Sequence, residues 1–241
     1  MKNSNSTRRQ PDLRTEAIVL RRTDYGEADR ILQLLTPEGK RSVIAKGARK
    51  EKSKLAGGIE LFSISEVVIH EGRTELGILT GAKLLEYYDA FVKDIELIEM
   101  GGVMMRSVSA RAEQVESPEF YKILKQSLQM MQKHAVDENK RWKDILRAWW
   151  GINLARASGE DINLHFDTDG DKLLADGRYY WDEEQAALAK AGAGRIGADH
   201  IKMMRLMASG PAELSLKVAG ADALIDEILY VARCIEKVAV V

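Results

Sequence analysis

The first third of the chain consists of short apolar runs separated by turn residues, and each run has the length of a β-strand. Within one of these runs, side chains alternate between two faces, with Val67 and Ile69 on one face and Val68 on the other. The predicted strands are Thr15–Arg22, Ala28–Thr36, Arg41–Ala45, Glu60–His70 and Glu75–Leu85. Five strands with a long excursion after the third favour the OB-fold, a Greek-key barrel that binds oligonucleotides. An SH3-like barrel fits the strand count nearly as well.

From residue 94 onward the apolar spacing changes to three and four residues, which predicts amphipathic helices. Ser117 and Pro118 form a helix start, as N-cap and first helical residue. The predicted helices cover about 94–115, 117–131, 140–158, 199–208 and 222–238. Residues 160–195 are less regular, and we expect a strand at Ile162–Phe166, a turn, and a returning strand within Lys172–Trp181.

These patterns predict an α+β protein in which a five-stranded OB-fold barrel is followed by a mainly helical domain. The expected limits are a disordered tail at 1–13, the barrel at 14–92 and the helical domain at 93–241. Residues of about 160–195 form a small irregular insert in the helical domain.

Charge is distributed unevenly along the chain, although the net charge is only −1. Residues 1–92 contain 16 Lys and Arg against 13 Asp and Glu, and the excess lies mainly between Gly39 and Gly58. The segment after the predicted strand at 41–45 is too polar and rich in glycine to pack in a core, so it predicts an exposed basic loop that binds a polyanion. A solvated surface is the alternative. The candidate DNA-binding residues are Arg22, Tyr25, Lys40, Arg41, Lys46, Arg49, Lys50, Lys52 and Lys54.

Among these candidates, Tyr25 is the aromatic residue best placed to stack on a base, because it lies in the first predicted turn. A cationic surface with few aromatic residues favours binding of the phosphate backbone over reading of sequence. DNA and RNA both fit that description, so an RNA-binding OB-fold protein of RNA metabolism is the alternative function.

Other classes of function receive little support from the sequence. The only cysteine is Cys234, so we expect neither an internal disulfide nor a cysteine zinc site, and no cofactor. No nucleophile elbow or Walker loop is present, and we expect that the protein is not an enzyme. A metal-dependent hydrolase using His165, Asp167 and Asp169 is a second alternative. Without a secretory signal or an apolar run of membrane-spanning length, the protein is expected to be cytoplasmic.

Several of these segments, taken in order, resemble the N-terminal half of the bacterial RecO family. They are TEAIVL at 15–20, YGEADRIL at 25–32, AKGAR at 45–49, KSKL at 52–55 and ELGILTGAKLLEY at 75–87. The resemblance implies an OB-fold that binds single-stranded and double-stranded DNA, a recombination mediator that anneals strands, and partners that include RecR, the acidic C-terminal tail of the single-stranded DNA-binding protein SSB and, indirectly, RecA. Many members carry a four-cysteine zinc motif, but residues 160–190 of this chain contain no cysteine.

The resemblance also implies a place for an acidic tail, which needs cations beside an apolar pocket. The richest group of cations in the helical domain lies on two consecutive predicted helices. The candidate tail-binding residues are Lys122, Lys125, Arg141, Lys143 and Arg147, with Phe120 or Tyr121 nearby. An ordinary solvated helix surface is the alternative.

Overall fold

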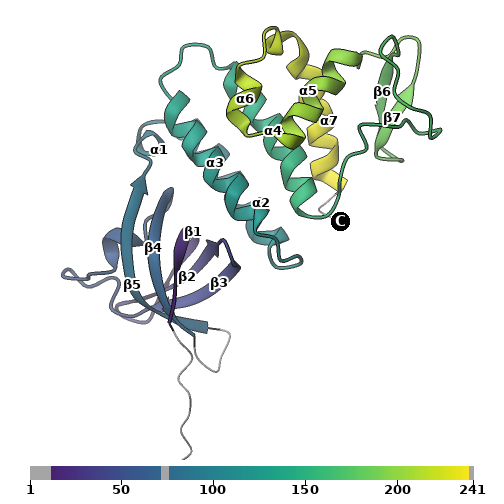
Figure 1. The fold of residues 1–241 in the computed structure, drawn as a ribbon. Coiled ribbons are helices and arrows are strands. Elements are labelled where there is room, and N and C mark those ends of the chain that lie inside the picture. Colours follow the sequence, from purple (N-terminus) through teal and green to yellow (C-terminus); the bar gives the residue numbers. More distant parts are fainter. Residues whose placement is uncertain (1–11, 72–75, 239–241) are drawn as a thin grey trace, which may run out of the picture. The chain divides into compact units, whose positions relative to one another are not determined.

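The computed structural model describes residues 12–71 and 76–238 (Figure 1). Most of the predicted disordered tail, 1–13, lies outside the described residues, as does the predicted turn before the fifth strand. Two compact units are present, and each is described by itself. The barrel unit comprises Met1–Asp89 and Gly102–Tyr121, and the helical unit comprises Ala90–Gly101 and Lys122–Val241. The domain limits expected from the sequence stay a prediction.

Five strands close into a barrel, which confirms the predicted OB-fold (Figure 1). They are β1 (Leu13–Tyr25), β2 (Asp29–Thr36), β3 (Gly39–Ala45), β4 (Ser63–His70) and β5 (Leu76–Tyr87). Their order around the barrel is β1-β2-β3-β5-β4, and β4 pairs with β1 to close it. Every pair is antiparallel except β3 with β5. β1 continues to Tyr25, beyond its predicted end.

The barrel interior is filled by the apolar members of each alternating strand. In β4 the odd-numbered residues point inward, so Val67 and Ile69 are each 1% exposed. The core cluster is Ala17, Val19, Leu32, Leu34, Val43, Ala45, Ala48, Ile59, Val67, Ile69 and Leu79. Because Ala48 and Ile59 belong to the connection between β3 and β4, the two ends of that connection are held by the core.

The end of this connection is fixed by a close backbone approach. It contains a short 3₁₀ helix, η1 (Ala56–Gly58). A Cβ atom at Gly58 would lie 2.7 Å from the backbone carbonyl carbon and oxygen of Ala82 in β5. Only glycine allows this contact, so η1 is seated directly on the barrel wall.

Seven helices and a two-stranded sheet complete the described chain. The helices are α1 (Ala90–Lys93), α2 (Ile95–Arg111), α3 (Glu119–His134), α4 (Arg141–Ala157), α5 (Ala198–Ser209), α6 (Ala212–Leu216) and α7 (Ala221–Val238). α2 and α3 each contribute residues to both units. In the helical unit, α4 packs against α5, α6 and α7, and Trp149 of α4 is 2% exposed. The helices expected from sequence are present, whereas the short α1 and α6 were not predicted.

The irregular insert differs from its prediction. Its strands are β6 (Tyr179–Asp182) and β7 (Ala187–Lys190), which pair with each other. The strand predicted at Ile162–Phe166 is wrong, since only Phe166 forms an isolated bridge there, with Lys172. The physical reason is local: the side chain of Asn163 accepts hydrogen bonds from the amides of His165 and Phe166, each at 3.0 Å, and this turns the backbone.

Candidate nucleic-acid interface

The interface loop, residues 46–54, follows β3 directly and folds against the turn between β1 and β2, residues 26–28. The amide of Arg49 donates to the carbonyl oxygen of Ala28 at 2.9 Å, and the amide of Gly47 donates to Asp29 Oδ1 at 2.7 Å. Gly47 has a φ of +66°, a conformation that glycine adopts at little cost. Two segments separated in sequence therefore form one connected surface.

A shared carboxylate strengthens this connection. Asp24 Oδ1 accepts a hydrogen bond from Arg30 Nε at 3.1 Å, and Asp24 Oδ2 lies 3.4 Å from Arg49 Nε. Exposed ion pairs of this kind contribute only about 0.2–1 kcal/mol each. Arg49 can therefore exchange Asp24 for a phosphate at small cost, while the backbone contacts hold the loop in place.

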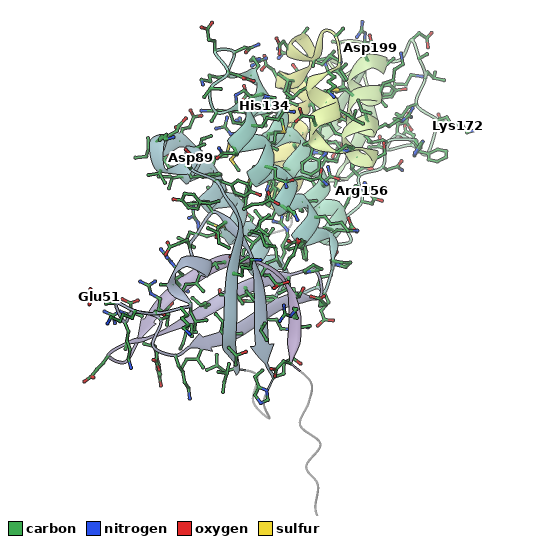
Figure 2. The ribbon with its side chains drawn as sticks, turned by 60° about the vertical axis from the view of Figure 1, so that its left-hand side comes forward. Glu51, Asp89, His134, Arg156, Lys172 and Asp199 are labelled. Carbon is green, nitrogen blue, oxygen red and sulfur yellow. The ribbon has the colours of Figure 1, made fainter. Side chains whose placement is uncertain are left out.

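The remaining lysines of the interface loop point into solvent. Figure 2 shows the loop around Glu51 extending from the barrel, with its side chains directed away from the strands. Within residues 12–71 and 76–238, no ion pair involves its four lysines. The exposed cations are Lys46, Lys50, Lys52 and Lys54. Tyr25, which was predicted to lie in a turn, is the last residue of β1 and is 54% exposed. The barrel unit thus presents exposed cations and an exposed aromatic ring, a composition suited to single-stranded nucleic acid.

Three of the predicted binding residues lie elsewhere and have protein partners. Lys40 lies in β3 with a side chain 9% exposed, where its Nζ donates to Ser109 Oγ at 2.9 Å and pairs with Glu113. This contact lowers the pKa of the Glu113 carboxyl group. Arg41 lies 3.5 Å from Glu71 and Arg22 lies 2.6 Å from Glu60. Their role as DNA ligands stays a prediction and is not part of the interface proposed below.

The predicted tail-binding cations on α4 are surrounded by carboxylates. Lys143 is the most buried, with a side chain 4% exposed, and its Nζ pairs with Glu96 and lies 3.8 Å from Asp94 Oδ2. Arg147 contacts Glu96 at 3.1 Å. The ammonium group of Lys143 is therefore already used in ion pairs within the protein.

Arg141 is also paired, with Asp226 at 2.9 Å and with Asp144 at 3.3 Å. Lys122 is exposed and Lys125 is partly exposed, and both have interactions within the protein. The aromatic residues suggested for the tail are buried, Phe120 at 1% and Tyr121 at 5% exposure. An acidic tail would therefore have to displace existing ion pairs at this surface.

The residues of the hydrolase alternative form a turn. Asp167 is 6% exposed, and its Oδ1 accepts hydrogen bonds from the amides of Asp169 at 3.1 Å and Asp171 at 2.9 Å. No cluster of three or more His, Cys, Asp or Glu side chains arranged for a metal ion occurs in the described chain. None of its helices is long and apolar enough to cross a membrane.

Asp29 is a functional residue that no sequence pattern selected. It reads as an ordinary polar residue before a strand, and only the folded chain brings its carboxylate to the amide of Gly47, 18 residues away. A glycine that follows a strand in a basic segment indicates a turn with positive φ. It does not indicate which side chain accepts the hydrogen bond from the amide of that glycine.

Replacing Asp29 with alanine should loosen the interface loop without unfolding the barrel. The lost acceptor leaves the Gly47 amide without its bond, and we expect a loss of stability of about 1 kcal/mol. Nucleic-acid affinity should fall severalfold, because the lysines lose their fixed arrangement. Asp12→Ala, on the same unit, is the matched control. Unchanged backbone exchange at Gly47 and Arg49 in Asp29→Ala would contradict this role.

Comparison with known protein families agrees with this architecture. Residues 11–88 match the family model described as "Recombination protein O N terminal". A "DNA repair protein RecO" of Roseiflexus sp. (strain RS-1) is 47% identical over 85 residues, which cover 35% of this chain and 30% of that protein. A "DNA repair protein RecO" of Dehalococcoides mccartyi (strain ATCC BAA-2266 / KCTC 15142 / 195) is 31% identical over 180 residues, covering 71% of this chain and 66% of that protein. In these two comparisons the chain spans between about a third and just under two thirds of its relative.

Proposed function

We propose that the chain is a recombination mediator, because residues 11–88 match the family model of the recombination protein O N terminal and the chain is similar to DNA repair proteins RecO. It would act in the cytoplasm, bind single-stranded and double-stranded DNA through the barrel unit, and anneal complementary strands. The observation that carries the proposal is the interface loop, which has four exposed lysines on a backbone held by Asp29.

The binding free energy would come mainly from phosphates. Each lysine that contacts a phosphate releases condensed counterions, so affinity falls steeply as the salt concentration rises. A protein that holds two strands by their backbones leaves the base edges free to pair. Annealing by this route needs no nucleotide hydrolysis and no catalytic group, so we propose a binding protein and not an enzyme.

The proposed partners are a RecR-like protein, the acidic tail of SSB and, indirectly, RecA. The charges of the helical unit support binding of the acidic SSB tail only in part. Lys122, Lys125 and Arg147 remain candidates for the tail, and Lys143 is the weakest, since it is buried against Glu96. An acidic tail would compete with Glu96 for Arg147. Both competitors are carboxylates, so the tail would replace one ion pair of Arg147 with a similar one.

Annealing of two complementary labelled oligonucleotides tests the proposal. We expect the protein to accelerate annealing of bare strands at least tenfold at about 50 mM salt and to retain activity when the strands are coated with SSB. An RNA pair of the same sequence distinguishes the alternative function in RNA metabolism. Acceleration of RNA pairing alone, or of neither pair, would contradict the mediator function.

A further inference from the structure

The outer face of the barrel, the side of β1, β2 and β3 that points away from the core cluster, is covered at one end. Leu34 belongs to the core, so Leu35 and its register partner Ile18 lie on the outer face. Both are fully buried. Ile31 and Ile44 lie on the same face, nearer to the interface loop, and are half-buried. The outer face is therefore more accessible at the end beside the loop than at its far end.

The C-terminal part of α2, which belongs to the barrel unit, contacts the far end of this face. Ser109 Oγ donates to Gln33 Oε1 at 3.3 Å, and Gln33 lies on the outer face of β2. Lys40 Nζ donates to the carbonyl oxygen of Ser109 at 3.3 Å and to its Oγ at 2.9 Å. It also pairs with Glu113, one helical turn further along α2. The ammonium group of Lys40 is thus bound by acceptors on α2 alone.

Lys40 and Lys46 mark the two ends of one face of β3. Alternation puts Lys40, Ser42 and Ile44 on the outer face, and Lys46 is the next residue of the same parity. Six residues of strand span about 20 Å, which is the length of about six phosphates along one strand. Lys46 is exposed, whereas the side chain of Lys40 is 9% exposed. The two lysines therefore differ in access, although both lie on the face that continues from the interface loop.

The carboxylate that pairs with Lys40 is open to solvent. The Glu113 side chain is 63% exposed, and the hydrogen bond from Lys40 lowers its pKa, so it stays ionised at neutral pH. A phosphate carries the same kind of charge and can replace this carboxylate at the ammonium group. The two acceptors of Ser109 are neutral and hold Lys40 less strongly than a carboxylate does. Glu113 is thus the acceptor with which a nucleic acid competes.

We propose that Glu113 limits the length of single strand that the barrel unit binds, because it keeps Lys40 on α2. While the pair is intact, phosphates contact the interface loop and the adjoining end of the outer face. When a phosphate replaces Glu113, Lys40 becomes a further phosphate ligand, and the bound strand extends along β3 from Lys46 to Lys40. This inference rests on the proposed function, since it concerns the same nucleic-acid surface.

Glu113→Gln tests the proposal with thymidine oligonucleotides of about 4 and about 16 nucleotides, the limits of the site sizes known for OB-folds. Fluorescence anisotropy at about 50 mM salt should show about fivefold higher affinity for the long oligonucleotide and an unchanged affinity for the short one. The slope of log affinity against log salt should steepen by about 0.7 for the long oligonucleotide, because one phosphate contact is added. Lys40→Gln in the Glu113→Gln background should remove both gains.

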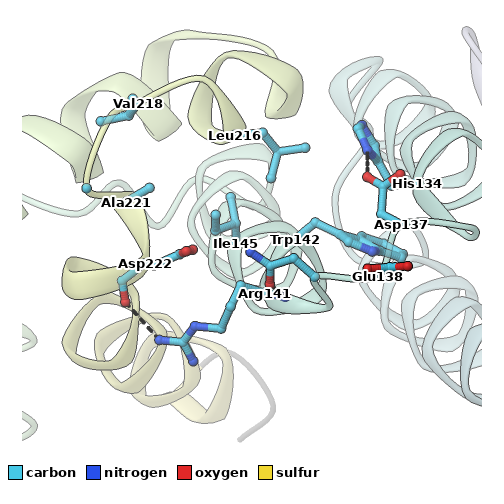
Figure 3. Close-up of a pocket in the computed structure, with 12 residues that line it drawn as sticks. His134, Asp137, Glu138, Arg141, Trp142, Ile145, Leu216, Val218, Ala221 and Asp222 are labelled. Atoms are coloured by element: carbon cyan, nitrogen blue, oxygen red, sulfur yellow. Dashed lines mark hydrogen bonds and ion pairs between the residues drawn. The ribbon is translucent and has the colours of Figure 1, made fainter.

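Two controls remove the same charge elsewhere. Glu116→Gln changes an exposed carboxylate that is not bonded to Lys40. Glu138→Gln changes an exposed carboxylate at the wall of a pocket of about 470 Å³ in the helical unit (Figure 3). We expect wild-type affinity from both. A gain as large in either control, or a gain that persists without Lys40, overturns the proposal.

The same titrations separate this inference from the proposed function. Wild-type binding of the long oligonucleotide with no change in Glu113→Gln overturns the inference alone. Absence of binding by the wild type and by every variant overturns the proposed function and the inference together.

Discussion

Reversal of three charges in the interface loop, Lys46, Arg49 and Lys50 to glutamate, should lower the affinity for single-stranded DNA about a thousandfold at 50 mM salt. The variant loses three phosphate contacts and adds three repulsive charges, and each lost contact also removes about 0.7 from the slope of log affinity against log salt. Fluorescence anisotropy of an end-labelled oligonucleotide, measured from about 50 to 200 mM salt, gives both quantities.

Arg49 has contacts of its own with Asp24 and Gly26, so a second variant is needed to separate binding from loop structure. Lys46, Lys50 and Lys52 to glutamate leaves those contacts in place, and we expect a loss of similar size. The matched control reverses Lys172, Lys190 and Lys217, which are exposed in the helical unit. A loss as large in this control would show a general charge effect and contradict an interface at the loop.

Replacing Lys143 with alanine should destabilise the helical unit by about 2–3 kcal/mol. The Lys143 side chain is 4% exposed, pairs with Glu96 and lies 5.7 Å from the ring centre of Trp142. Its removal leaves Asp94 without this cation and leaves Glu96 with Arg147 as its remaining cation, and loss of one partner of a buried pair costs about 3–5 kcal/mol. We expect the loss of stability to lie at or below the lower end of that range, because the Glu96 side chain is 50% exposed. Urea unfolding followed by tryptophan fluorescence reports on this unit alone, since all four tryptophans belong to it.

The pH dependence of unfolding distinguishes this ion pair from simple loss of packing. Hydrogen bonds from Lys143 and Arg147 lower the pKa of Glu96 below 4.5. A lowered carboxyl pKa contributes stability above the unfolded-state value, and that stability is lost as the pH falls through the folded-state value. Wild type should therefore lose stability below about pH 4.5 more steeply than Lys143→Ala. Lys133→Ala, which breaks the exposed pair with Glu213, is the control and should cost less than about 1 kcal/mol.

The sequence predicted the barrel because strand alternation, turn residues and strand count all depend on local pattern. The same is true of the long helices, whose apolar stripes are continuous. Prediction failed where one side chain changed the local backbone: Asn163 binds the amides of His165 and Phe166 and replaces the expected strand with a turn. It also missed α1 and α6, whose four and five residues are too few to show a helical period.

The candidate site was predicted as a region and not as a set of contacts. A charge count identifies a basic segment but cannot show which cations have partners in the fold. Lys40 belongs to the same basic segment of the sequence as the loop, yet strand alternation directs it to Ser109 and Glu113. Lys143 reads as a surface cation at helical spacing and is in fact buried. The partners of Lys40 and of Lys143 come from distant parts of the chain, so no local pattern in the sequence indicates them.

The location of the nucleic-acid interface is the central claim, and hydrogen–deuterium exchange with and without a single-stranded DNA oligonucleotide tests it most directly. We predict that bound DNA slows amide exchange in residues 24–30 and 46–54, that the protection disappears as salt is raised, and that the reversal of Lys46, Lys50 and Lys52 abolishes it. Protection confined to the helical unit, with unchanged exchange in these two segments, would contradict the account.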